Sequence, residues 1–451
     1  MSVPPQAACL VEAGLQSRIL LPSDAEYSAR QDSYWSNSAK LKPACIIAPR
    51  STEEVSAAVK ALVKTQQRFA IRSGGHTNWP GSNNTDGGVT IDLGFINSTS
   101  YGKTTEVVSI GPGAKWREVY RELHQHGRAV AGGREGNVGV AGLLLGGGNT
   151  FFTARRGFAC DNVVAYEVVL ADGSIITADN HADLFRALKG GSNNFGIVTR
   201  FDMTAIPTDR VWGGMTFFPK DKIPSAIDAM VTFTDNVEKD PDSNLVCIFT
   251  YMPNFQDIVI ATLYAQMAGV ENAPAYEKWL GIPEMMDTVK MTSISDMAFE
   301  YNIPSGYYTT WFTMCFKNDT RILTKASSLH NGLVEELKRR IPEGDFITQC
   351  LFQPLPKLFG QRSVAAGGNV MGAAFAQPMV KEWIDQIREF ASTIEGGVQD
   401  WVYLNYADGT QDPIGSYGAE NVQKIREVAA KYDPLGAFQT LCPGGFKLSR
   451  S

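Results

Sequence analysis

Three glycine-rich segments in the first half of the chain constrain its fold more than any other feature of the sequence. They read RSGGH, VGVAGLLLGGG and GGSNNFGIV, at residues 72–76, 138–148 and 190–198, and each adjoins a strand-like run. Glycine tolerates positive φ and lets backbone N–H groups approach a ligand with no Cβ in the way. Clustered N–H groups neutralise a phosphate without basic side chains, which suits a pyrophosphate in a chain of net charge −6. Together the segments predict a nucleotide site, although a tight turn would explain any one of them.

Several other classes of protein are excluded by motifs that the sequence lacks. It contains no GxxxxGK[ST], which excludes a P-loop, and residues 142–148 do not supply GxGxxG between a strand and a helix, which disfavours a Rossmann site. Seven cysteines without a CxxC pair indicate neither a disulfide scaffold nor a cysteine zinc site, and no metal is expected. The negative net charge argues against nucleic acid as a partner. No run of about 18 apolar residues is present, so a membrane span is not expected.

The compartment stays open at this level. The opening residues, MSVPPQAACLVEAGL, lack the basic end and apolar core of a secretion signal, so the protein stays inside the cell or lost a signal before this numbering begins. Cys9 and Cys45 would pair in an exported protein, or remain two free buried thiols. No feature indicates an oligomeric state.

Length predicts two domains, because 451 residues exceed one ordinary core. In residues 1–205, short apolar runs alternate with helical stretches. Ser51 and Glu54 have the spacing of a helix capping box, and Trp116 starts an amphipathic helix that stops at Gly127. Residues 162–178 read as a hairpin with Asp172-Gly173 as its two-residue turn. The other predicted strands are CIIAP (45–49), RFAIRS (68–73), VTIDL (89–93) and VVSIG (107–111).

Longer strand-like runs follow in residues 206–399. They are VWGGMTFF (211–218), LVCIFTYM (245–252), DIVIATLYAQ (257–266), YYTTWFTMCF (307–316), DFITQCLFQ (345–353) and NVMGAAFA (369–376). The clearest helices cover residues 322–341 and 380–393. Long strands interrupted by helices predict one antiparallel sheet with helices packed on one face. The remaining residues, 400–451, contain a predicted strand, WVYLNY (401–406), and a helix that ends near Tyr432.

Taken together, the three glycine-rich segments resemble those of the FAD-linked oxidases of the vanillyl-alcohol oxidase and berberine-bridge-enzyme type, which carry a PCMH-type FAD-binding domain. The resemblance runs from PACIIAPRSTEEV near the start to DPLGAFQTLCPGGF near the end. With the strand pattern it implies an α+β fold: an FAD-binding domain at residues 1–205, a substrate domain at 206–399 and a segment at 400–451 that returns to the FAD-binding domain. Ligand sites favour such domain interfaces.

The resemblance also implies how FAD is held. In that family the RSGGH turn holds the FAD pyrophosphate, and its histidine is bonded to the C8 methyl of the flavin, which makes His76 the expected attachment residue. A neutral imidazole is a competent nucleophile near neutral pH, whereas an isolated histidine after two glycines would be read as a polar turn residue. The residues expected to bind the cofactor are Arg72, Ser73, Gly74, Gly75, His76, Thr77, Val138, Gly139, Gly142, Leu145, Gly146, Gly147, Asn149, Phe152, Gly157, Asp161, Asn162, Gly196, Ile197, Val198, Tyr403 and Asn405.

One position departs from the family pattern. Many berberine-bridge-like members form a second flavin bond from a cysteine three residues before the VG of the second glycine-rich segment. That position is Glu135 in GREGNVG, and Cys160 lies too far along the chain to replace the cysteine. The expectation is therefore a single covalent attachment, which disfavours a bulky oligosaccharide substrate.

The motif YLNYAD at residues 403–408 matches the YxNYxD of the family, which returns the chain to the flavin ring. In a strand, Tyr403 and Asn405 would face the same side and Tyr406 the other. The resemblance suggests that Tyr403 and Asn405 approach flavin and substrate while Tyr406 supports the fold. A tyrosine packed at a domain interface is the alternative.

The base that takes the substrate proton is not identified by sequence. Family members often use a carboxylate on the substrate-domain sheet, but the candidates here are Gln353 and Gln377, which do not ionise. Gln353 is retained with Tyr403 and Asn405 as a catalytic candidate. Tyr308 and Trp311 are expected to line the pocket, and core packing explains them equally well.

The function that follows is an FAD-dependent oxidase. It would transfer hydride from a small aromatic, polyketide-like or alkaloid-like molecule to covalently bound FAD, and O2 would reoxidise the flavin to give hydrogen peroxide. Such a reaction fits a tailoring or oxidative cyclisation step in specialised metabolism. The alternatives are a carbohydrate or alcohol oxidase, a flavoprotein that guides a non-redox cyclisation, and a binding protein derived from the enzyme family.

Overall fold

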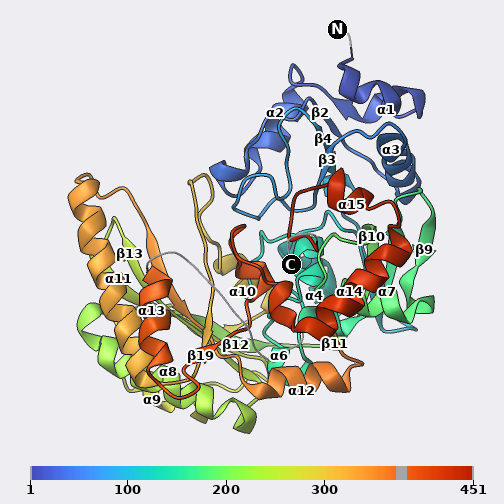
Figure 1. Ribbon diagram of the computed structural model, residues 1–451. Coiled ribbons are helices and arrows are strands. Elements are labelled where there is room, and N and C mark those ends of the chain that lie inside the picture. The colour runs from blue at the N-terminus through green and yellow to red at the C-terminus, as the bar shows by residue number, and fades with distance from the viewer. Residues whose placement is uncertain (1–2, 372–382, 449–451) are drawn as a thin grey trace.

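The computed structural model describes residues 3–371 and 383–448, which form two parts side by side (Figure 1). The first part combines two small sheets with the helices around them. The second part is a larger antiparallel sheet with helices on one side. The last helices of the chain, red in Figure 1, lie against the first part. The protein is therefore an α+β protein, as the strand pattern predicts.

The first small sheet lies near the N-terminus. Its strands, in spatial order, are β1 (Ile19–Leu20), β2 (Cys45–Ile47), β4 (Val89–Asp92) and β3 (Phe69–Arg72). The last three run parallel, and β1 pairs antiparallel with β2. β3 leads directly into the first glycine-rich segment, so the sheet positions that turn.

The helix after β2 begins where the capping spacing predicts. In α3 (Thr52–Lys64), Oγ of Ser51 accepts a hydrogen bond from N of Glu54 at 3.3 Å. The reciprocal half of the capping box is replaced, because the Glu54 carboxylate accepts from Arg18 and from the backbone of Arg50 instead. The apolar face of α3 is fully buried, as its periodicity predicts.

The second small sheet is antiparallel throughout. Its strands, in spatial order, are β5 (Thr99–Gly102), β6 (Val107–Ile110), β10 (Ile197–Thr204), β8 (Val163–Val169) and β9 (Ile175–Thr177). Five residues, 170–174, separate β8 from β9. The backbone N–H of Leu170 donates to O of Ser174, so the tight turn contains residues 171–173, one residue more than the two-residue turn predicted. Gly173 takes the positive φ that such a loop needs.

Helices from both ends of the chain surround these sheets. They are α1 (Ala8–Glu12), α2 (Ala25–Asp32), α4 (Trp116–His124), α5 (Val140–Leu145), α6 (Thr153–Arg156), α7 (Ala182–Leu188), α14 (Ala419–Tyr432) and α15 (Ala437–Thr440). Backbone and side-chain hydrogen bonds hold the C-terminal segment in place: N of Phe69 donates to O of Leu441, and the Tyr417 hydroxyl donates to O of Gly190. A two-stranded ribbon of β7 (Arg128–Ala129) and β11 (Ile206–Pro207) precedes the second part.

The second part is built on one antiparallel sheet. Its strands, in spatial order, are β15 (Met286–Asp287), β12 (Val211–Pro219), β14 (Asp257–Gln266), β13 (Ser243–Met252) and β18 (Thr348–Phe352), with β16 (Lys290–Thr292) beside β12. The helices α8 (Ile223–Asp235), α9 (Glu277–Leu280), α11 (Thr320–Arg340) and α13 (Trp383–Ser392) lie on the side turned away from the first part (Figure 1). Two further helices, α10 (Ile294–Glu300) and α12 (Lys357–Ala365), contact the first part.

One predicted strand, residues 307–316, is replaced by a clasp onto the first part. Only its end forms a strand, β17 (Cys315–Phe316), which pairs with β19 (Val398–Gln399). N of Asn37 donates to O of Tyr307, and the indole N–H of Trp35 donates to O of Ile303. These residues bond to the first part instead of to a sheet neighbour, which overrides their strand propensity.

The predicted strand WVYLNY is also not a strand. It passes through a single 3-10 turn, Leu404–Tyr406, closed by the bond from N of Tyr406 to O of Tyr403. N of Val402 donates to Oγ of Ser416 rather than to a neighbouring strand. In the predicted strand at 369–376, residues 369–371 are not in a strand, and residues 372–376 lie outside the described residues, as does Gln377.

All seven cysteines are free thiols, so the structure favours the unpaired alternative for Cys9 and Cys45. Burial raises the pKa of the Cys45 thiol to about 12. Among the described helices, none combines the length and the apolar character that crossing a membrane requires.

A backbone contact joins the first two glycine-rich segments. A Cβ built on Gly74 would lie 2.5 Å from Cα of Gly139, and one built on Gly139 would lie 2.5 Å from N of Gly74. Real Cβ atoms do not approach backbone atoms so closely, so both positions require glycine. Gly142, in α5, differs because a Cβ there would have nothing within 4 Å.

We predict that Gly74→Ala destabilises the fold, whereas Gly332→Ala, at an exposed position in the helix α11, does not. The methyl group at position 74 would push two backbone segments apart, at a cost of about 1–3 kcal/mol. At position 332 it would meet no atom within 4 Å and would favour the helix by about 0.5–1 kcal/mol. Thermal unfolding of the two variants beside the wild type measures the difference. Equal melting temperatures for Gly74→Ala and Gly332→Ala would contradict the contact.

His330 links α11 to β18 through a hydrogen bond between its Nε2 and Oγ1 of Thr348, 2.8 Å apart. Burial, aided by the charge of Lys220, lowers the pKa of His330 to about 4. A histidine in the unfolded chain has a pKa near about 6.5, so below that pH the unfolded state binds a proton that the folded state does not. Stability is therefore lost as the pH falls from about 6.5 toward 4.

We predict that His330→Gln weakens this acid dependence. One such histidine lowers the free energy of unfolding by at most about 1.4 kcal/mol for each pH unit in that window. Urea unfolding at pH 7.0, 6.0 and 5.0 should show a smaller loss of stability in the variant than in the wild type. His124→Gln, at an exposed position in α4, serves as the control. Parallel curves for wild type and His330→Gln would show that His330 does not carry the effect.

Candidate functional site

A cavity of about 500 Å³ lies between the glycine-rich segments of the first part and the bare face of the large sheet. It is the place where most of the sequence-predicted site residues meet. The predicted residues that line it are Ser73, Gly74, Gly75, His76, Thr77, Val138, Gly139, Gly142, Leu145, Asn149, Gly196, Ile197, Val198, Tyr403 and Asn405. All three glycine-rich segments therefore contribute to one wall.

The opposite wall is apolar and comes from four strands of the large sheet. β12, β13, β14 and β18 contribute side chains that include Phe217, Ile248, Leu263 and Leu351. Strand alternation explains this face, because residues two apart point to the same side. The cavity is thus polar and glycine-rich on one wall and apolar on the other.

Arg72 supports the first segment from below rather than lining the cavity. It is buried, and its guanidinium donates to O of Arg30, Oγ of Ser33 and the carboxylate of Asp92. The ring of Tyr34 stacks on the same group, with Cζ 3.8 Å from the ring centroid. Gly75 turns over this guanidinium with a φ of +71°. A buried cation with four partners fixes the turn that presents His76.

His76 is held between an indole and a carboxylate. Its ring stacks on Trp35, with centroids 4.5 Å apart and planes 11° apart. Its Nε2 lies 3.6 Å from Oε2 of Glu135. Burial lowers the pKa of His76 to about 3, and the nearby charge of Lys115 adds to the effect. The imidazole is therefore neutral near pH 7, with a nitrogen lone pair available, and its contact with Glu135 is not an ion pair.

Glu135, which the resemblance picks out as a departure from the family pattern, lies beside His76 at one end of the cavity. It is buried, and burial raises the pKa of its carboxyl. Within the described part of the chain, Nε2 of His76 has no hydrogen-bond partner. The Glu135 carboxyl oxygens make no hydrogen bond of full geometry either, although the N–H groups of Asn137 and Val138 and the Asn137 side chain lie close enough to oppose the rise in its pKa. Unsatisfied buried polar atoms at one end of a cavity indicate that a polar ligand completes the site.

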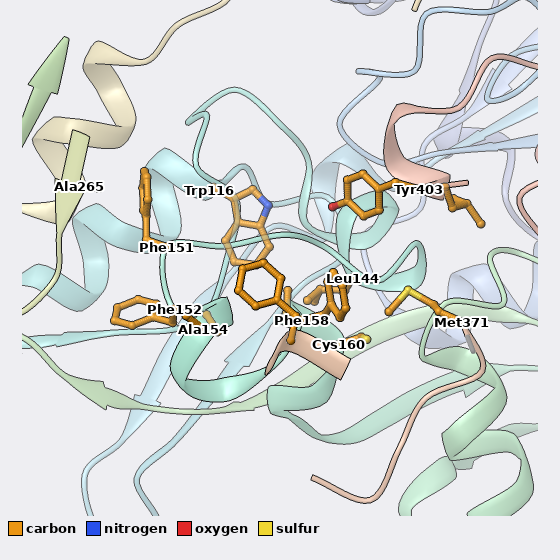
Figure 2. Close-up of a cluster of buried hydrophobic side chains, with 14 of the residues drawn as sticks. Trp116, Leu144, Phe151, Phe152, Ala154, Phe158, Cys160, Ala265, Met371 and Tyr403 are labelled. Carbon is orange, nitrogen blue, oxygen red and sulfur yellow. The ribbon is translucent and has the colours of Figure 1, made fainter. Parts of the chain in front are cut away.

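Tyr403 and Asn405 fasten the C-terminal segment to the second glycine-rich segment. Asn405 accepts at Oδ1 from N of Gly148 and donates to O of Gly142, at 2.9 and 3.0 Å. The Tyr403 hydroxyl accepts from N of Asn149, and its ring lies beside Phe158 in the apolar core (Figure 2). Burial raises the pKa of Tyr403 well above its usual range, so this phenol keeps its proton.

Arg134 is a site residue that sequence reasoning missed. It lines the cavity and donates from Nη2 to Oε1 of Gln353, at 2.7 Å, and to the hydroxyl of Tyr406, at 3.1 Å. Gln353 lies behind this arginine and outside the cavity lining. Tyr406, expected only to support the fold, lines the cavity with its ring against Trp311. In the sequence, the feature that could have indicated Arg134 is an arginine within the glycine-rich stretch GGREGN, residues 132–137.

The remaining predicted cofactor residues build the core beneath α5 and do not line the cavity. They are Gly146, Gly147, Phe152, Gly157, Asp161 and Asn162. Figure 2 shows Phe152 and Cys160 among the apolar side chains below Leu144. Asp161 accepts from N of Phe158 and from Ser363 and Asn369, which joins the two parts of the chain. Tyr308 is 83% exposed and does not line the cavity.

The cavity has the features that FAD would need. Gly142 lines it, and a Cβ there would enter open space rather than protein, so the absent side chain leaves room for a ligand. Polar atoms that have no hydrogen-bond partner among the described residues, such as Nε1 of Trp79 and Oδ1 of Asn83, also lie on the lining. A neutral wall rich in backbone N–H groups suits a pyrophosphate, and the apolar face suits a flat ring system.

Comparisons with known proteins identify an FAD-binding family and a matching fold. Residues 43–179 match the family described as FAD binding domain. The chain is 38% identical to the FAD-dependent monooxygenase drtC of Aspergillus calidoustus over 98% of this chain and 90% of that protein. It is 37% identical to the FAD-dependent monooxygenase sdcF of Emericella nidulans over 98% of each. Its fold matches 6-hydroxy-D-nicotine oxidase from Arthrobacter nicotinovorans with a TM-score of 0.75, at 18% identity over 97% of this chain and 99% of that one. The chain thus belongs to the family of FAD-dependent oxidoreductases that includes these two relatives and carries this FAD binding domain.

Proposed function

We propose that this enzyme is an oxidase that takes a hydride from a small aromatic, polyketide-like or alkaloid-like molecule and passes the electrons to O2, which gives hydrogen peroxide. The observation that carries the proposal is the two-walled cavity, with His76 and the glycine-rich segments facing an apolar sheet. Bound FAD supplies the two-electron acceptor. The apolar wall favours a substrate with a largely unsaturated carbon skeleton over a sugar, whose hydroxyl groups would find few partners there.

His76 is the proposed attachment residue for the flavin. Its imidazole is neutral, its orientation is fixed by the stack on Trp35, and it ends the turn that Arg72 supports. With glutamate at position 135 in place of a cysteine, we propose that His76 makes the single covalent link. Gly74, Gly75 and the second segment would then hold the pyrophosphate through backbone N–H groups.

The residues around the substrate have distinct proposed roles. Tyr403 and Asn405 position the second glycine-rich segment and do not take up a proton, because Tyr403 is buried and hydrogen-bonded. Gln353 positions Arg134 through its carbonyl oxygen. Tyr406 accepts from Arg134, which leaves its own O–H to donate to a bound substrate, so Tyr406 is the proposed substrate-orienting group at Oη.

Monooxygenation is the second candidate, because the two relatives described above, each matched over 98% of this chain, carry that name. The two reactions differ in the fate of oxygen. An oxidase releases both atoms of O2 as hydrogen peroxide, whereas a monooxygenase places one atom in the product and the other in water. The same cavity would serve either reaction.

We predict that His76→Ala releases the flavin from the polypeptide. After denaturation in acid, yellow fluorescence should stay with the wild-type chain and pass into the supernatant for the variant. His124→Ala, an exposed histidine on α4, is the matched control and should retain the flavin. If the wild-type protein also releases its flavin, the covalent link is wrong while FAD binding stands. If neither protein ever carries flavin, the proposed function is wrong.

We further predict one hydrogen peroxide for each O2 consumed during turnover. The measurement uses a panel of aromatic alcohols, phenolic polyketides and alkaloid amines, with an oxygen electrode and a peroxide assay run together. Turnover under ¹⁸O2 should give products without label. If the product carries ¹⁸O and much less peroxide forms than O2 is consumed, the enzyme is a monooxygenase and the oxidase proposal is wrong.

A further inference from the structure

We propose that Arg134 recognises an acidic oxygen of the substrate, so that the enzyme acts on an aromatic or conjugated carboxylic acid, phenol or enol bound as its anion. This inference rests on the proposed function, because it names the substrate class of the same cavity. It concerns binding, and its test does not depend on turnover.

The first support is that Arg134 has no acidic partner. Throughout residues 3–371 and 383–448, no carboxylate lies within ion-pair distance of its guanidinium. Its two hydrogen-bond partners, Gln353 and Tyr406, are both neutral. A half-buried cation without a counter-ion is costly to hold in a protein, and an anionic ligand would supply the missing charge.

The second support is the geometry of the guanidinium. Both hydrogen bonds leave from Nη2, and within the described residues Nη1 and Nε donate to no protein acceptor. Arginine presents its N–H groups as a planar fork that matches two oxygens of a carboxylate or adjacent oxygens of an enolate. Gln353 and Tyr406 therefore orient the group while leaving much of the fork for a ligand.

The third support is the charge of the rest of the cavity. Apart from Arg134 and the tyrosines, the described lining residues include two ionisable side chains, His76 and Glu135. His76 is neutral near pH 7 because burial lowers its pKa to about 3. Burial raises the pKa of Glu135, which lies against His76 at one end. Arg134 is thus the cation of an otherwise uncharged or weakly acidic cavity.

The fourth support is the wall that faces Arg134. Tyr406 and Trp311 stand beside it with ring centroids 5.1 Å apart, and the sheet contributes aliphatic and aromatic side chains. A ligand with one anionic end and a flat carbon body would place its charge on the guanidinium and its body on these surfaces. An uncharged polyol would satisfy neither.

Matched pairs of ligands test the inference on the protein as purified. Benzoate is compared with benzamide, and cinnamate with cinnamamide, at pH 7.5, since each pair differs mainly in charge. Quenching of tryptophan fluorescence reports binding, because Trp35, Trp79 and Trp311 line the cavity. The wild type should bind each anion about tenfold or more tightly than its amide, the loss expected when a charge-assisted hydrogen bond is removed.

Two variants assign the preference to Arg134. Arg134→Gln should bind anion and amide with nearly equal affinity, and Arg134→Lys, which keeps the charge but loses the fork, should keep a reduced preference. Arg121→Gln, an exposed arginine on α4, is the control and should behave as the wild type. Equal binding of anion and amide by the wild type, absence of binding by both, or an anion preference that survives in Arg134→Gln would each overturn the proposal. A purified protein without flavin would instead overturn the proposed function, while the fluorescence titration would still decide the role of Arg134.

Discussion

The backbone contact between Gly74 and Gly139 is the constraint on which the rest of the site depends. It brings the turn that ends at His76 against the loop that carries Arg134 and Glu135. No side chain could stand at either glycine without separating the two segments. The buried guanidinium of Arg72 fixes the backbone of the turn, and the indole of Trp35 fixes the orientation of the His76 ring. The imidazole of His76 is thereby fixed at one end of the cavity by backbone contact, by the hydrogen bonds of Arg72 and by ring stacking.

In the C-terminal segment, different residues anchor the backbone and contact the cavity arginine. Tyr403 and Asn405 form hydrogen bonds with the backbone of the second glycine-rich segment. Tyr406, one turn further, meets Arg134 and faces the cavity. Tyr403 and Asn405 therefore anchor the segment while also lining the cavity, and Tyr406, for which the resemblance implied only a supporting role, contributes a phenol to the same lining.

Much of the architecture follows from local pattern. The helix after Ser51, the buried face of α4 and the strand at residues 257–266 lie where periodicity and capping place them. The errors arise where distant contacts override that pattern: Tyr307 bonds to Asn37 instead of a strand, and 401–406 turns to reach α5. The order and composition of the three glycine-rich segments made it possible to predict that they and His76 line the cavity. The role of Arg134 was not predictable, since it depends on Gln353, which lies 219 residues further along the chain.

The clasp between residues 303–307 and the segment around Trp35 has a mechanical consequence. It ties the second part of the structure to the first directly beside His76, and Asp161 with Ser363 and Asn369 ties the two parts again near α5. Two attachments on separate elements oppose a hinge motion between the parts. Ligands must then enter by movement of side chains or single loops, and little binding free energy is consumed in closing the protein around them. Affinity in such a preorganised site is set by complementarity of shape and charge.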